Sequence, residues 1–255
     1  MCTVSFIPNS RGFYLAMNRD ERLMRPTGLP PRVFEDGGRR VMYPREPSGG
    51  TWIALNDSGV FQALINWHRV DRRPAGRVVS RGEVARTAAA GTSLEEIAEK
   101  LRRLPLQRIR PFRFIAGVPG EGLIAEYRWD LQELAMQIHD WTPRHWFSSG
   151  YDEEKAEHER ARVCQDAWQQ DSAGSIEWLR NLHSLHLPER GPFSICMHQP
   201  VAGTVSYTEV SLLNQAATMR YKPGSPCLPG RIYETTLFVG QGVGNLGGSQ
   251  TGELR

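Results

Sequence analysis

The sequence has few cysteines and lacks long apolar runs. Its four cysteines, among 255 residues, include no Cys-x-x-Cys pair and none of the dense spacing of a disulfide scaffold. No run of 18 or more apolar residues occurs, and no charged segment followed by a short apolar stretch opens the chain. We therefore expect neither a disulfide-rich secreted domain nor a membrane span, but a cytoplasmic protein with reduced thiols.

The chain has little net charge of either sign, because its basic and acidic residues nearly balance. The formal net charge is +3, and the arginines are scattered, as in Arg39-Arg40, Arg72-Arg73 and Arg102-Arg103. Nucleic-acid-binding proteins carry clustered basic residues, often interleaved with aromatic ones, and that pattern is missing. We expect a small-molecule partner, with a modest preference for anions, and no nucleic acid partner. The sequence leaves the oligomeric state open.

The composition is that of a globular protein. Hydrophobic residues make up 40% of the chain and charged residues 23%. We find no internal repeat and no linker, so we expect one domain over residues 1–240. Residues 241–255 are rich in Gly, Ser and Gln, which predicts a flexible C-terminal tail.

Alternating and helical apolar patterns predict an α+β protein. Five prolines in residues 21–47 predict mostly loop there, with a short strand at 40–43. Strands are predicted at 2–7, 13–18, 51–56, 60–67, 112–118, 123–127, 131–138, 193–198, 204–207, 210–221 and 232–239. Helices are predicted at 80–90, 93–104, 152–170 and 175–183, the first opened by a Ser80–Glu83 capping box.

Cys2 is the first candidate catalytic residue. If Met1 is removed, Cys2 carries a thiol and a free α-amine only a few atoms apart. A free thiol has a pKa of about 8.5 and an α-amine one of about 7.7–8.0, so the amine can take the thiol proton near neutral pH. This pairing predicts a nucleophile activated by its own N-terminal amine. The alternative is a buried cysteine in a strand.

A predicted β-hairpin brings a polar cluster to Cys2. The turn at 8–12 returns the chain, so Asn18, Arg19 and Asp20 should lie close to Cys2. Alternation places Asn18 and Asp20 on one face and Arg19 on the other. We predict that Asp20 orients the α-amine, that Asn18 and Arg19 contact substrate, and that Arg19 anchors a substrate carboxylate. The alternative is a solvated strand end with weak ion pairs.

Several motifs together resemble one family. They are Met1-Cys2-Thr3, Asn18-Arg19-Asp20-Glu21, Arg25-Pro26, Gly49-Gly50-Thr51-Trp52, Cys196-Met197-His198 and Gly203-Thr204-Val205-Ser206. The set resembles the NRDE family, also called the transport and Golgi organisation protein family, over about the first seventy residues and again over about 193–222. That family is grouped with the N-terminal nucleophile (Ntn) hydrolases. The resemblance implies a four-layer αββα sandwich of two mainly antiparallel sheets.

The resemblance also implies further site residues. In related choloylglycine-type acylases an Asn after a Gly-rich strand pair helps to form the oxyanion hole, and Asn66 matches that place in order and pattern. Those acylases have a second Asn where this chain has Ser148-Ser149. A hydroxyl or backbone N–H there, as at Ser149, would substitute. The alternative is that Asn66 only closes its strand into the loop that follows. Trp52 is expected in the core or in the wall of the substrate pocket.

The cysteines and histidines are not spaced in the sequence as the ligands of known metal sites are. Cys196 and His198 share one face of a predicted strand, which suggests ligation, but the sequence implies no further ligands. His183 and His186 are three residues apart, without a neighbouring Cys or carboxylate. We therefore predict no metal and no cofactor, and we place His198 in the pocket near Cys2.

These observations predict an N-terminal cysteine hydrolase or acyltransferase that acts on a linear amide (C–N) bond of a small molecule after removal of Met1. Cys2, Asp20 and Asn66 would be the catalytic residues. The alternative is a non-catalytic carrier or chaperone for a lipid-like or haem-type ligand on the same fold, with the nucleophile idle.

Overall fold

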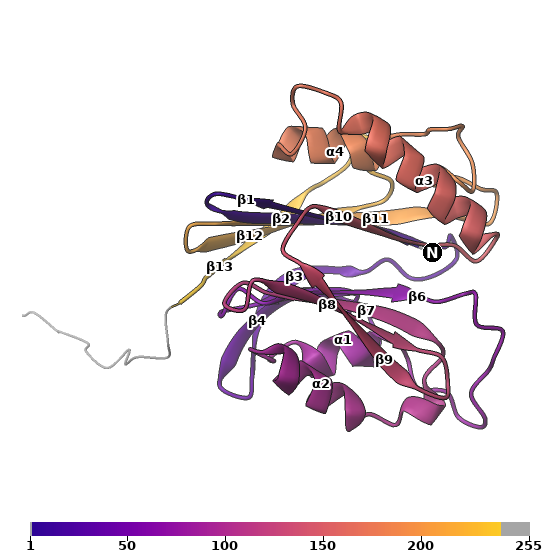
Figure 1. Cartoon of the computed structure of the whole chain (residues 1–255). Coiled ribbons are helices and arrows are strands. Elements are labelled where there is room, and N and C mark those ends of the chain that lie inside the picture. The colour runs from indigo at the N-terminus through magenta and orange to yellow at the C-terminus, as the bar shows by residue number, and fades with distance from the viewer. Residues whose placement is uncertain (1, 241–255) are drawn as a thin grey trace, which may run out of the picture.

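Two antiparallel sheets form the centre of the protein (Figure 1). The structure is a computed structural model that describes residues 2–240. The first sheet contains, in spatial order, β10 (Arg144–Ser148), β1 (Cys2–Asn9), β2 (Gly12–Arg22), β11 (Ala202–Leu213), β12 (Ala216–Pro223) and β13 (Tyr233–Phe238). The second contains β3 (Leu29–Asp36), β4 (Arg39–Arg45), β5 (Ile53–Asn56), β6 (Phe61–Asn66), β7 (Phe112–Val118), β8 (Leu123–Trp129) and β9 (Leu134–Asp140).

Helices cover the outer face of each sheet. Figure 1 shows one pair beside the first sheet and the other pair beside the second, with the two sheets between them. The pairs are α3 (Glu153–Ala167) with α4 (Ile176–Ser184), and α1 (Gly82–Ala88) with α2 (Leu94–Arg102). A 3-10 turn (Leu106–Arg108) follows α2. The predicted four-layer αββα sandwich is therefore confirmed.

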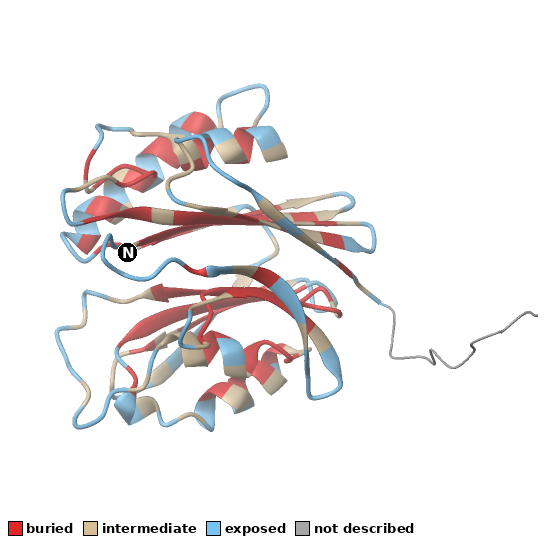
Figure 2. Cartoon of the chain, turned by 180° about the vertical axis from the view of Figure 1, so that it is seen from behind, coloured by how far each residue is buried: buried red, intermediate tan, exposed pale blue. Residues whose placement is uncertain are grey.

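Strand alternation supplies the core between the sheets. Val4 and Phe6 in β1 point toward the second sheet, where Phe6 stacks on Phe61 with ring centroids 4.9 Å apart. Two further apolar clusters lie between each sheet and its own helices. Buried residues accordingly run through both sheets and along one side of each helix (Figure 2).

The second helix of the 80–104 region begins and ends as its sequence predicts. The Ser93 side chain accepts a hydrogen bond from the Glu96 backbone N–H at 3.1 Å, which caps the helix. Leu94, Ile97 and Leu101 lie on the buried side. The first helix differs, because Arg81 occupies the cap position and its side chain makes no capping bond to the helix, and Glu83 pairs with Arg86 instead. The predicted capping box is therefore wrong.

Two secondary-structure predictions were wrong. Residues 29–45 form the antiparallel pair β3–β4. The short strand predicted at 40–43 lies within β4 and is confirmed, but β3 falls in the stretch predicted as loop. An edge strand tolerates prolines because one side needs no ladder hydrogen bonds, and β3 is such an edge, with its register shifted between Leu29 and Arg32.

The predicted strand at 193–198 is instead an irregular segment. Its backbone groups bond outside a strand ladder, since the Ser194 hydroxyl donates to the Cys196 carbonyl at 2.7 Å and the Cys196 N–H donates to the Leu185 carbonyl at 2.9 Å. Within residues 2–240, no helix combines the length and apolar character that crossing a membrane requires. The tail predicted at 241–255 lies outside the described residues.

Candidate functional site

The predicted hairpin is confirmed, and its register determines what lies beside Cys2. Cys2 pairs directly with Arg19 across the β1–β2 ladder. Directly opposed residues share a face, so both side chains point between the two sheets. Asp20 lies one residue further along β2, and its carboxylate is directed toward α3. Arg19, rather than Asp20, is therefore the residue on the nucleophile's own face of the sheet.

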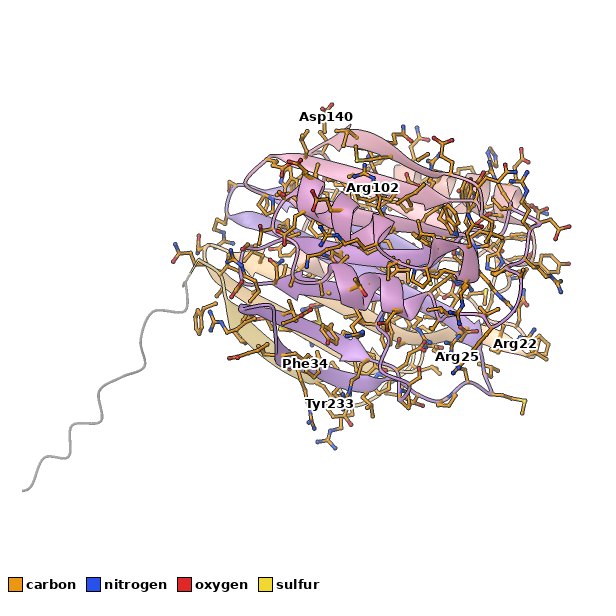
Figure 3. The ribbon with its side chains drawn as sticks, turned by 90° about the horizontal axis from the view of Figure 1, so that it is seen from below. Arg22, Arg25, Phe34, Arg102, Asp140 and Tyr233 are labelled. Carbon is orange, nitrogen blue, oxygen red and sulfur yellow. The ribbon has the colours of Figure 1, made fainter. Side chains whose placement is uncertain are left out.

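A cavity of about 230 Å³ opens at this end of the sandwich. It brings together five residues that the sequence singled out, namely Cys2, Arg19, Asp20, Trp52 and Asn66. A neighbouring depression extends the mouth. Arg25 lines both, and Figure 3 shows it at the same end of the molecule as Arg22. Charged side chains of both signs therefore line the cavity.

Cys2 lines the cavity and is buried, with 6% of its surface exposed. Burial raises the pKa of the Cys2 thiol above its ordinary value, and the Asp20 carboxylate raises it further. The Asp20 backbone N–H and the Arg19 guanidinium act in the opposite direction. The thiol is thus protonated at neutral pH and needs a base to become a nucleophile.

Asp20 is buried and held by two side chains from distant elements. The Thr204 hydroxyl donates to Asp20 Oδ1 at 2.6 Å, and the Arg160 guanidinium lies 3.5 Å from Oδ2. Burial raises the pKa of Asp20, while the charge of Arg160 and the bond from Thr204 lower it. These contacts fix the carboxylate beside the N-terminal strand.

Arg160 is fully buried, and the sequence analysis did not single it out as a site residue. Its guanidinium donates to Thr3 Oγ1 at 3.2 Å and to the Cys2 and Ser148 carbonyls at 3.4 Å. It therefore ties α3 to the ends of three neighbouring strands. A signal was present, because Arg160 lies four residues from both Ala156 and Cys164 on the apolar stripe of its helix.

Arg19 is already partly neutralised. Its guanidinium contacts Glu46 Oε1 at 2.6 Å and lies 4.6 Å from the centre of the Trp52 ring. Glu46 also pairs with Arg25 at 2.8 Å. Trp52 forms the pocket wall as expected, while Arg19 belongs to a charge network and is less suited to anchor a substrate carboxylate than predicted.

Two further cations line the cavity and were not singled out from the sequence. Arg81 donates to the Pro111 carbonyl at 3.1 Å and lies near Arg110. Burial, followed by repulsion from Arg110, lowers the pKa of Arg81 to about 10, so it stays charged at neutral pH. Two like charges held together at a pocket wall favour the binding of an anion.

Asn66 and the two serines have different surroundings. Asn66 ends β6 and lines the same cavity as Cys2, as the oxyanion role requires. Ser148 pairs with Cys2 across β1 and β10, and its buried hydroxyl lacks a hydrogen-bond partner within the described chain. Ser149 lines a separate depression beside His68 and accepts from the Tyr151 N–H at 3.2 Å.

Two predicted substrate contacts point elsewhere. The Asn18 amide donates to the His183 and Ile195 carbonyls, at 2.8 and 2.9 Å, on the helix-covered face of the sheet. Asn18 and Asp20 do share a face, as alternation predicts, and that face is the helix-covered one; Asp20 nevertheless also lines the cavity, whereas Asn18 does not. His198 lies with two cysteines and His186, outside the set of residues that lines the cavity.

Comparison with known proteins places the fold. Penicillin V acylase from Agrobacterium tumefaciens superposes with a TM-score of 0.56 at 13% identity, over 92% of this chain and 85% of that one. A mutant of conjugated bile acid hydrolase from Clostridium perfringens gives a TM-score of 0.55 at 12% identity, over 92% of each chain. At these identities the likeness shows the fold alone.

Family comparison covers most of the sequence. No curated protein matches the chain. The family model described as Transport and Golgi organisation 2 matches residues 1–189, which confirms the resemblance found in the N-terminal motifs. The chain belongs to the transport and Golgi organisation 2 family.

Proposed function

We propose that the protein, once Met1 is removed, is an N-terminal cysteine hydrolase or acyltransferase that acts on a linear amide of a small anionic molecule. The observation that carries the proposal is the cavity itself. Cys2, Asp20 and Asn66 line it together. The acylase and the hydrolase that share this fold add support to the choice of reaction class.

The proposed reaction has two steps on the same thiol. Cys2 Sγ attacks the carbonyl carbon while the thiol proton passes to the α-amine of Cys2, and the amine then protonates the leaving nitrogen as the C–N bond breaks. A thioester and a free amine result. Water, deprotonated by the α-amine, attacks the thioester carbon and the C–S bond breaks. A second amine in place of water gives acyl transfer.

The surrounding residues have separate roles in this proposal. Asp20, held by Arg160 and Thr204, orients the α-amine. The Asn66 amide donates to the oxyanion, a contribution measured elsewhere at roughly 2.7–4 kcal/mol per donor. Arg19 contacts Glu46 and Trp52, which fix it opposite Cys2 on the neighbouring strand. We assign it the role of positioning the Cys2 side chain, not a direct role in the reaction.

The charge of the cavity suggests the substrate class. Four arginines and three carboxylates line it, and Arg81 and Arg110 are mutually repulsive neighbours. We propose that a carboxylate on the acyl part of the substrate binds these two cations, a role assigned to Arg19 from the sequence alone. The same charged lining suits a lipid-like or haem-type ligand poorly, because such ligands need mostly apolar walls.

The test uses a matched pair of chromogenic amides, glutaryl-p-nitroanilide and its neutral analogue butyryl-p-nitroanilide. We expect cleavage of the anionic substrate to be favoured at least roughly tenfold in kcat/KM, since about 1.4 kcal/mol of added binding gives that factor. Arg81→Gln with Arg110→Gln should remove the preference but retain cleavage. Arg102→Gln, on the exposed surface of α2, is the matched control.

Cys2→Ala should abolish cleavage of both substrates, and Cys164→Ala, which removes a thiol buried in α3, should retain it. Cleavage that survives Cys2→Ala would overturn the enzyme proposal. Undiminished tight binding of an apolar ligand by Cys2→Ala, without turnover in the parent, would favour the carrier. Equal rates on the two amides in the parent would overturn the anionic substrate class alone.

A further inference from the structure

Four side chains that bind soft metals meet outside the candidate active site. They are His186, Cys196, His198 and Cys227, which come from three segments of the chain. His186 follows α4, Cys196 and His198 precede β11, and Cys227 lies between β12 and β13. The sequence spacing indicated only Cys196 and His198 as a possible pair of ligands, and the fold brings His186 and Cys227 to them.

The distances are close to those of a tetrahedral zinc site. One ligand atom from each residue can be chosen so that all four lie within 4.8 Å of one another. His198 Nε2 lies 3.5 Å from Cys196 Sγ and 3.4 Å from Cys227 Sγ. Zinc bonds of about 2.3 Å to sulfur and 2.0–2.1 Å to nitrogen place tetrahedral ligands roughly 3.3–3.8 Å apart.

A second observation concerns His186. Its Nε2 atom is buried and has no hydrogen-bond partner among residues 2–240. Its ring lies against that of His198, with centroids 5.0 Å apart. A buried ring nitrogen without a partner costs free energy, which a coordinate bond to a metal would offset.

We propose that His186, Cys196, His198 and Cys227 bind one zinc ion as a structural site. Two thiolates and two imidazoles form the Cys₂His₂ set that structural zinc prefers, and four protein ligands leave no open position for catalysis. The two thiolates also neutralise the charge of the ion, so it can lie in a half-buried place.

The site would support the carboxylate beside Cys2. The Met197 N–H, between two of the ligands, donates to Thr204 Oγ1 at 2.9 Å, and that hydroxyl donates to Asp20. On the other side, the Ser225 hydroxyl donates to the Thr204 carbonyl at 2.9 Å. Zinc would thus hold together the segments on both sides of Thr204. The proposal does not depend on the proposed reaction.

The test measures metal in the full-length protein, purified under reducing conditions without chelator. We expect about one zinc ion per chain by elemental mass spectrometry. Replacement of zinc by Co²⁺ should give the visible bands of tetrahedral cobalt and a thiolate-to-cobalt charge-transfer band. Cys227→Ser and His186→Ala, both at partly exposed positions, should lower zinc retention after dialysis at least about tenfold.

Cys164→Ala and His158→Ala, which change a cysteine and a histidine on α3, are the matched controls and should retain zinc. Far-UV circular dichroism checks that each variant is folded. Folded parent protein that neither contains zinc nor binds added Zn²⁺ or Co²⁺ would overturn the proposal. So would a Cys196–Cys227 disulfide that persists under reducing conditions, or zinc retained equally by the ligand variants and the controls.

Discussion

At the scale of single residues, the Asp20 carboxylate depends on side chains from two distant elements. Arg160 and Thr204 reach Asp20 from α3 and β11, more than 130 residues further along the chain. Asp20 and Arg160 are both buried. Removing one partner of a buried ion pair leaves the other charge without compensation, so the stability of the fold should depend on Arg160.

Arg160 gives the first residue-scale prediction. Arg160→Met should lower the free energy of unfolding by roughly 3–5 kcal/mol, because it leaves the buried Asp20 carboxylate without its cation. Asp20→Asn should also destabilise the protein. The double variant should lose less than the sum of the two losses, by about 1–2 kcal/mol, since the two groups interact directly. Urea unfolding of the four proteins measures the coupling.

Arg162→Met on the same helix is the control for that cycle. Its side chain is 53% exposed and pairs with two carboxylates on its own helix, so the loss should be below about 1 kcal/mol. Additive losses from Arg160→Met and Asp20→Asn would show that the ion pair does not hold the carboxylate.

At the scale of elements, the sequence predicts the helices and strands whose apolar residues recur at a regular spacing. It fails where the tertiary surroundings decide the structure of a segment. The stripe and cap of α2 and the alternation of β1 and β2 predicted where each element begins to within one residue, although β2 continues four residues beyond its predicted end. The prolines at 30 and 31 led to the prediction of a loop where β3 forms. Prolines are tolerated there because β3 lies at the edge of its sheet. The apolar run at 193–198 resembled a strand, but its backbone groups bond to Leu185 and Ser194 instead. Both errors concern tertiary context.

The strand β8 carries the second prediction, which is a pH dependence. Glu126 is buried and contacts Arg113 at 2.6 Å and Arg128 at 2.8 Å. Burial acts to raise the pKa of Glu126, but the hydrogen bonds and charges of the two arginines outweigh it and hold the value at about 2. In the unfolded chain the pKa is about 4.3. The folded state thus favours the ionised carboxylate.

Glu126→Gln should therefore lower the free energy of unfolding by roughly 3 kcal/mol near neutral pH. A lowered pKa stabilises the fold above the unfolded value, and the benefit is lost as pH falls through the folded value. The difference between parent and variant should be constant above about pH 5 and shrink toward pH 2. Glu133→Gln, in the exposed turn before β9, is the control. A difference that is independent of pH would contradict the assignment.

At the scale of the whole molecule, the fold places one cavity where both sheets contribute. Cys2 and Arg19 come from the first sheet, and Trp52 and Asn66 from the segments that form the second. The family motifs indicated most of these residues. Arg81 and Arg110 lie on either side of the α1–α2 region, and their role depends on how that region folds back to the pocket. The sequence could not place them.

The proposed chemistry depends on a free Cys2 α-amine in this cavity. The most direct test is the intact mass of the full-length protein, expressed with its native N-terminus and mixed with p-nitrophenyl glutarate before an acid quench. The account predicts a chain without Met1 that carries one added glutaryl group, and no added group in Cys2→Ala. Retention of Met1, or acylation that is unchanged in Cys2→Ala, would contradict it.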